Sequence, residues 1–223
     1  MLLARALRCN PRLHLVVVVP RVPDQEGALA VFPNRVGQLQ ALEVCREASA
    51  DRVHVFNLEN PMGTPVYVHA KVCTVDDVWA SVGSDNMNRR SWTHDSELSA
   101  AVVDEERDDR EPPDPRNDGV GARRFPRDLR LRLAHEHLDL DAGSDDDPEL
   151  VDPESFVAAF EASAERLDQW HVNGRGGPRP PGRLRRHEPA PVGPLMRLWA
   201  APAYRLLHDP DGRPIRMRRA GQF

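Results

Sequence analysis

The stretch VHAKVCTVDDVWASVGSDN, residues 68–86, contains the side chains of this sequence that are best suited to chemistry on a charged substrate. Lys71 is the only lysine among 30 basic residues, and it follows His69 by two positions. A histidine can act as nucleophile or proton carrier near neutral pH, and a lysine ammonium is a compact positive charge. Residues two apart on a strand share a face, so we expect both groups to enter the same space.

The residues after Lys71 predict a hairpin that brings more polar groups to this place. Two aspartates at positions 76–77 indicate a tight turn, after which residues 78–83 return antiparallel. The returning strand ends next to Ser84 and Asn86, which should then lie near His69. A nucleophile that can be neutral, a fixed positive charge and two neutral hydrogen-bond donors suit a tetrahedral anion, meaning a phosphate.

The spacing of these residues matches a known signature. It reads H-x-K-x4-D followed after six residues by G-S-x-N, and its members are His69, Lys71, Asp76, Gly83, Ser84 and Asn86. This pattern resembles that of the phospholipase D superfamily. Residues 88–98, NRRSWTHDSEL, are similar to the segment that follows it in bacterial phospholipases D, with Glu97 at an acidic position. The resemblance is most specific over residues 52–103.

The resemblance implies a catalytic mechanism and roles for the matching residues. In such enzymes one histidine attacks phosphorus to form a phosphohistidine, a second histidine protonates the leaving alcohol, and water or another alcohol releases the phosphoryl group. His69 would take one of these two roles. Lys71, Asn86 and Ser84 would bind the phosphate oxygens, and Glu97 would hydrogen-bond the other ring nitrogen of His69. Asp76 would brace the turn, and no cofactor or metal is required.

The superfamily pattern also implies that a second motif must come from elsewhere. Active members bring together two H-x-K-x4-D motifs, and this sequence has one. We therefore interpret the chain as a C-terminal half that needs a partner with the other motif. The partner could be a second copy of this chain, in a homodimer in which two copies of His69 face each other, or a complementary N-terminal half. We expect the docking face to be apolar and uncovered, and a lone chain to turn over weakly or not at all.

Several functions fit this pattern. The first is a phospholipase D that acts on glycerophospholipids, and the second is a phosphatidyltransferase of the cardiolipin synthase type. A truncated, non-catalytic remnant that binds lipid or a partner is the alternative from another class. A nuclease is disfavoured because residues 1–171 carry 19 basic and 32 acidic residues, so no nucleic-acid partner is expected.

The hydrophobic pattern predicts an α/β fold, with a mixed β-sheet flanked by helices as in half of a phospholipase D, and a helical, Arg/Pro-rich C-terminal extension. Strands and helices alternate in the first hundred residues, and the antiparallel hairpin makes the sheet mixed. The expected helices are 2–9, 35–48, 125–138 and 152–170, and the expected strands are 13–19, 52–58, 66–75 and 78–83. Asp152 should cap the last of these helices, with Pro153 in its first turn.

Composition divides the chain into four parts. Residues 1–104 would be the catalytic half, 105–122 an acidic linker, 123–171 a helical extension and 172–223 a basic tail. Residues 104–118 contain eight acidic residues and three prolines, which is typical of an exposed linker. The tail has 11 arginines against 3 acidic residues and could contact an anionic surface, so peripheral membrane contact is a further possibility.

Cysteines and hydropathy bear on the cellular compartment. Three cysteines, at positions 9, 45 and 73, form no close pair and indicate reduced thiols. The longest early apolar run, residues 13–19, is too short to cross a bilayer and does not follow a signal-peptide pattern. We therefore expect a cytoplasmic protein, or a peripheral or secreted one if the true start lies upstream.

Overall fold

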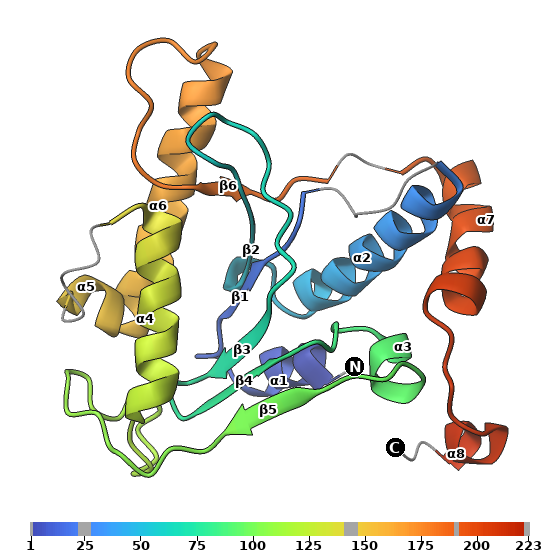
Figure 1. The fold of residues 1–223 in the computed structure, drawn as a ribbon, viewed down its shortest axis with the longest axis horizontal. Helices are drawn as coiled ribbons and strands as arrows, with labels where there is room; N and C mark the ends of the chain where they lie inside the picture. The colour runs from blue at the N-terminus through green and yellow to red at the C-terminus, as the bar shows by residue number, and fades with distance from the viewer. Residues whose placement is uncertain (1, 22–27, 141–146, 190–191, 221–223) are drawn as a thin grey trace.

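The computed structural model describes residues 2–21, 28–140, 147–189 and 192–220, and it has the α/β architecture that the sequence predicts (Figure 1). Two three-stranded sheets lie among helices of very different length. The elements in chain order are α1 (Leu2–Cys9), β1 (Leu15–Val18), α2 (Ala28–Ala48), η1 (Ala50–Arg52), β2 (Val53–Leu58), β3 (Lys71–Val75), β4 (Trp79–Gly83), α3 (Arg89–Thr93), β5 (Ser99–Val102), α4 (Arg124–Leu138), α5 (Pro148–Val151), α6 (Pro153–Val172), β6 (Leu184–Arg186), α7 (Pro194–Ala203), η2 (Tyr204–His208) and α8 (Ile215–Ala220).

Strand β2 is the centre of the fold because both of its faces are covered. Successive side chains of a strand point to opposite faces, so Val53 and Val55 pack with Leu7 of α1 and Leu42 of α2. The alternate residues of β2 belong to a second apolar cluster, with side chains from α4, α5, α6 and β6. Helices therefore cover the first sheet on both sides, with α4 and α6 on one side and α2 on the other (Figure 1).

The two sheets are separate, whereas the sequence suggested a single one. β1 and β2 run parallel, and β6 joins β2 antiparallel, so this sheet is mixed. β3, β4 and β5 form a wholly antiparallel sheet. The expected strand over 66–75 is shorter, because regular pairing begins only at Lys71. Residue Val66 instead donates its backbone amide to Leu58 of β2 at 2.8 Å, which leaves His69 in the connection between the sheets.

A buried arginine ties the hairpin to helix α4. The Arg127 side chain is fully buried and its Nε donates to Asp77 Oδ2 at 2.9 Å. Arg130, one turn later on the same helix, donates from Nε to Asp77 Oδ1 at 2.6 Å. Asp77 is itself buried in the turn between β3 and β4. Two guanidiniums thus neutralise a carboxylate that would be costly to bury alone.

The same arginine organises the acidic segment that follows β5. Arg127 Nη1 donates to Asp108 Oδ1 at 3.0 Å and to the carbonyl of Arg110 at 2.7 Å, and Nη2 donates to the carbonyl of Pro112 at 2.7 Å. Asp108 is buried, although its surroundings in the sequence predicted an exposed linker. Hydrogen bonds from Arg110 and attraction to Arg127 outweigh burial and lower the pKa of Asp108.

The basic tail is anchored to the first sheet by a second buried carboxylate. Glu59, directly after β2, is bonded by His171 Nε2 at 2.9 Å, Arg179 Nη2 at 3.2 Å and Arg185 Nη1 at 3.1 Å. Burial alone would raise the pKa of Glu59, but the bonds from His171 and Arg185 lower it. The stretch before β6, which belongs to the basic tail, is therefore fixed by charge as well as by strand pairing.

Helix α7 and the π-helical turn η2 pack on α2. The Tyr204 ring lies where a side chain on Gly37 would be, with ring atoms 2.2 Å from the place of a Cβ, so only glycine fits there. Burial, with Asp209 next in effect, raises the pKa of Tyr204 to about 12. Asp152 caps α6 by accepting from Ser155, as predicted. Across the described residues, no helix is long and apolar enough to cross a membrane.

His187 is buried directly after β6 and neither ring nitrogen has a hydrogen-bond partner in the described part of the chain. Its backbone amide donates to the carbonyl of Val55 at 2.8 Å. Burial, helped by the charges of Arg46 and other arginines, lowers the pKa of His187 to about 4. The folded protein therefore holds a neutral imidazole at pH values where the unfolded chain has a protonated one.

We predict that Asp77→Asn lowers the free energy of unfolding by roughly 3 kcal/mol, because buried Arg127 would keep only Asp108 as a charge partner and Arg130 would lose its own. Asparagine tolerates the positive φ of 55° at this position, so the change isolates the charge. Urea unfolding measures the effect. Asp76→Asn is the matched control: it also has positive φ, but its salt bridge to Arg116 is 3.8 Å long and exposed, so we expect less than about 1 kcal/mol. Equal losses would contradict the assignment.

We predict that His187→Leu makes stability less sensitive to acid. The pKa of His187 is 6.5 in the unfolded chain and about 4 in the folded protein. The unfolded chain therefore binds a proton first as the pH falls, and stability that is complete above pH 6.5 is lost toward pH 4. Between pH 7 and pH 4.5 the wild type should lose roughly 2 kcal/mol more than His187→Leu in urea unfolding. His94→Leu, which alters an exposed ring, should follow the wild type. Parallel curves for wild type and His187→Leu would refute this role.

Candidate functional site

Lys71 begins β3, and its side chain turns back along the chain toward His69. Lys71 Nζ donates to the backbone carbonyl of His69 at 2.7 Å, so the ammonium and this histidine belong to one small region. The His69 ring is exposed and lies beside the Tyr67 ring, with centroids 5.9 Å apart. Both motif side chains are thus accessible to a substrate.

The hairpin turn separates the two aspartates that follow. Asp76 and Asp77 both have positive φ, 52° and 55°, and the amide of Val78 bonds to the carbonyl of Val75 at 2.9 Å, as in type I′ turns. Asp77 is the buried, braced carboxylate, whereas the expectation placed the bracing on Asp76. Asp76 lies near Arg116 at the surface, and partial burial raises its pKa. Neither aspartate is at the His69 end of β3.

The hairpin register carries the G-S-x-N residues toward the motif, as predicted. Lys71 pairs with Gly83, so Ser84 and Asn86 follow at the end where His69 lies. Gly83 also faces Ser99 of β5 so closely that a Cβ would be 1.8 Å from the Ser99 hydroxyl. A glycine is therefore needed at this position by the close pairing of β4 with β5.

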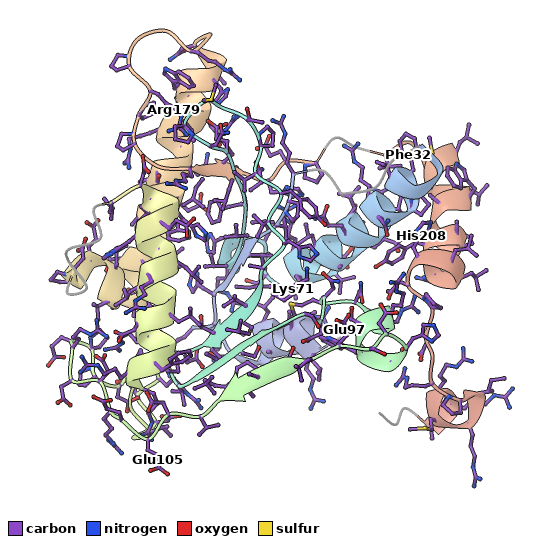
Figure 2. All side chains as sticks on the ribbon, in the orientation of Figure 1. Phe32, Lys71, Glu97, Glu105, Arg179 and His208 are labelled. Atoms are coloured by element: carbon purple, nitrogen blue, oxygen red, sulfur yellow. The ribbon has the colours of Figure 1, made fainter. Side chains whose placement is uncertain are left out.

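Ser84 and Glu97 bond each other at this end of the sheet. Ser84 Oγ donates to Glu97 Oε2 at 2.6 Å and accepts from the amide of Leu98 at 3.0 Å. The bond from Ser84 lowers the pKa of Glu97, and the charge of Lys71 acts in the same direction. In the part of the chain that the structure describes, no hydrogen bond joins Glu97 to the His69 ring. The expected contact is thus replaced by one with Ser84, beside Lys71 (Figure 2).

The loop after Asn86 is held by the C-terminal tail. Asn88 caps the short helix α3 by accepting from Ser91 at 2.8 Å. Asp209, which is buried after η2, accepts from the amide of Arg90 at 2.7 Å and from Arg89 Nε at 3.2 Å, and its carbonyl accepts from Arg89 Nη2 at 2.6 Å. A tail residue 120 positions away thus fixes the segment beside the candidate phosphate site.

Apolar side chains around the site are open to solvent. Leu98 is 83% exposed and Met87 69%, and the Tyr67 ring is half exposed. These residues flank His69 and the Ser84–Glu97 pair in sequence. A surface with large exposed apolar side chains beside charged ones is typical of an interface.

The arrangement can bind an anion and present a nucleophile to it. It offers an exposed imidazole, a lysine ammonium and the exposed amide of Asn86, while the Ser84 proton is already donated to Glu97. Within the described ranges, no group of three histidine, cysteine or acidic side chains is placed to hold a metal ion. A phosphate between His69 and Lys71 would meet one positive charge and neutral donors.

Sequence reasoning missed three of the residues that support the site. Asp77 was indistinguishable from Asp76 as a turn residue, although two adjacent aspartates were a signal that one could be buried. Arg127 carried no signal among 29 arginines. Asp209 could not be connected to α3 from the sequence, because the contact spans 120 residues.

Comparison with known proteins finds a family model similar to the part of the chain that contains these residues. Residues 31–109 match the family model described as "Cardiolipin synthase, PLD-like domain". This range includes the whole H-x-K-x4-D and G-S-x-N pattern together with Glu97. No solved structure matches the chain.

Curated relatives agree with this family. The chain is 29% identical over 181 residues to "Phospholipase D" of Phytophthora infestans, which covers 68% of this chain and 10% of the relative. It is 40% identical over 101 residues to "Phospholipase D zeta 1" of Arabidopsis thaliana, and the match covers 44% of this chain and 9% of the relative. It is 41% identical over 91 residues to "Phospholipase D C" of Dictyostelium discoideum, and the match covers 39% of this chain and 5% of the relative. The chain thus spans a tenth or less of the length of these relatives.

We predict that Asp209→Ala loosens the loop beside the site. The amide of Arg90 and the Arg89 guanidinium would lose a buried acceptor, so stability should fall by roughly 2 kcal/mol and the Arg90 amide should exchange with solvent faster. Urea unfolding and hydrogen exchange measure the two effects. Asp95→Ala removes an exposed partner of Arg90 and should cost less than about 1 kcal/mol. Unchanged exchange at residues 88–91 in Asp209→Ala would contradict the contact.

Proposed function

We propose that this chain, whose residues 31–109 form a PLD-like domain of the phospholipase D superfamily, is a phosphodiesterase acting on glycerophospholipids through a phosphohistidine intermediate. The observation that carries the proposal is the register of His69, Lys71, Ser84 and Asn86 at one end of the hairpin. That end is exposed, so a lipid head group can reach it.

Each residue would have a distinct task. His69 would attack phosphorus or protonate the leaving alcohol, depending on which of two paired motifs it represents. Lys71 and Asn86 would stabilise the charge that develops on the non-bridging oxygens. Ser84 and Glu97 would hold the end of the β4–β5 ladder in place beside Lys71, and Asp76, with the buried Asp77, would shape the turn.

Turnover would need a second H-x-K-x4-D motif from another polypeptide, since a phosphohistidine mechanism uses both a nucleophile and a general acid. The exposed apolar side chains of Met87 and Leu98, which adjoin Asn86 and Glu97 in the chain, support an interface beside the site that a partner would cover. The partner would be a second copy of this chain or a complementary N-terminal half that carries the other motif.

Two other functions fit the same residues. A cardiolipin synthase-type phosphatidyltransferase would use the phosphohistidine with an alcohol acceptor. The description of the matching family model, which names cardiolipin synthase, supports this alternative. A truncated, non-catalytic remnant would keep the anion site and bind lipid or a partner without turnover.

We predict that His69→Ala lowers choline release from phosphatidylcholine by at least about 1000-fold, and that Lys71→Arg lowers it by roughly 100-fold, because a planar guanidinium cannot replace a compact ammonium. Each variant is assayed at a protein concentration where sedimentation detects dimers. His14→Ala, which alters an exposed histidine outside the motif, should retain activity.

The same assay separates the alternatives. If the reaction passes through a phosphohistidine, water and an added alcohol compete for its phosphatidyl group. Adding a primary alcohol or glycerol would then yield a phosphatidyl-alcohol product. Equal and slow release by wild type and His69→Ala would overturn the enzymatic proposal and support the remnant. A monomer with full activity would overturn the need for a second motif.

A further inference from the structure

The C-terminal tail presents an apolar stripe to solvent. Leu195, Leu198, Pro202 and Leu206 follow one another at intervals of three, four and four residues, which places them along one side of α7 and η2. Leu195 is 81% exposed, Leu198 75% and Leu206 73%. A helix face of this kind is normally buried, yet here its opposite side already packs on α2 through Tyr204.

Arginines lie along the same part of the chain. Arg205 of η2 and Arg216, Arg218 and Arg219 of α8 are exposed, and none of these four side chains makes a hydrogen bond or salt bridge in the described residues. The nearby acidic groups are occupied: Asp209 bonds to α3 and Asp211 Oδ2 accepts from Arg213 Nη2 at 2.7 Å. The exposed charge of this segment is therefore positive.

α7 and α8 both lie at the outer edge of the molecule (Figure 1). α7 is on the far side of α2 from the β1–β2–β6 sheet, so its free face points away from the rest of the chain. Trp199 on α7 is 41% exposed and adds to the apolar stripe, and Ile215 at the start of α8 is 61% exposed on the separate last helix (Figure 1). We call α7, η2 and α8 together the tail surface.

We propose that the tail surface binds an anionic lipid membrane. An amphipathic helix with leucines and a tryptophan on one face and arginines beside it inserts its apolar face at the level of the lipid head groups. Anionic lipids attract the arginines, and each basic residue near such a surface adds several-fold to the affinity. The proposal rests on the tail residues alone and does not depend on the proposed activity.

Charge favours a membrane over a second copy of this chain. A two-fold contact between tail surfaces would bring four unpaired arginines of each copy close to those of the other, and like charges at an interface are unfavourable. An anionic membrane complements both the apolar stripe and the arginines. If the proposed activity is also correct, binding in this way would concentrate the chain where its phospholipid substrate lies.

The test is co-sedimentation of the full chain with vesicles. Wild type is mixed with vesicles of phosphatidylcholine alone, or with 30% phosphatidylglycerol, in ~0.1 M and ~0.5 M NaCl. We expect binding to the anionic vesicles at least about tenfold tighter than to the neutral ones, with most of the difference lost at high salt. This comparison uses no variant, so it does not depend on how a variant folds.

Two sets of substitutions assign the binding to the tail surface. R216Q/R218Q/R219Q should weaken binding to anionic vesicles by roughly 100-fold, and L195Q/L198Q/L206Q should weaken binding to both kinds. R132Q on α4 and V172Q at the end of α6 alter exposed residues elsewhere and should bind like wild type. Urea unfolding midpoints equal to wild type show that each variant is folded.

Three results would overturn the proposal. Wild type that does not sediment with anionic vesicles excludes membrane binding by this chain. Tail variants that bind as well as R132Q and V172Q assign the binding to another surface. Wild type that sediments as a dimer without vesicles, and that becomes monomeric in L195Q/L198Q/L206Q, assigns the apolar stripe to a second copy.

Discussion

The structure depends on one buried guanidinium. Arg127 lies at the point where the β3–β4 turn, the acidic segment after β5 and helix α4 meet, and it bonds to a carboxylate from each of the first two, Asp77 and Asp108. Charge pairing at such a place is directional, whereas apolar packing alone would allow the hairpin to slide on α4. The position of the hairpin, and with it the direction in which Lys71 points, follows from this contact.

The candidate site combines rigid support with an open face. Gly83 packs against Ser99, Ser84 bonds Glu97, and Asp209 holds the loop at α3, so the segments around Lys71 have fixed positions. The His69 ring, by contrast, is exposed, and large apolar side chains beside it are uncovered. A well-supported but open site is what a domain would present if a second polypeptide completed it.

The C-terminal region has a structural and a surface role. Its first part joins the main sheet as β6 and is held by Glu59, and its second part packs on α2 through Tyr204. The basic composition suggested a tail that contacts an anionic surface, but arginines that meet buried carboxylates become structural. Among the tail arginines that the structure describes, the exposed side chains of Arg205, Arg216, Arg218 and Arg219 remain available to an external partner, which is the basis of the tail surface.

The sequence by itself determined the local features of this protein. The positions of α1, β2, the hairpin turn and the α6 cap follow from periodicity, turn residues and capping, which act over a few residues. The spacing of His69, Lys71, Ser84 and Asn86 likewise needs only strand geometry. Tertiary structure decided what acts across a hundred residues: which of two adjacent aspartates is buried, that β6 completes the sheet, and that Asp209 supports α3. Those contacts depend on where α4, α6 and α7 pack, and no local pattern encodes the meeting of such distant segments.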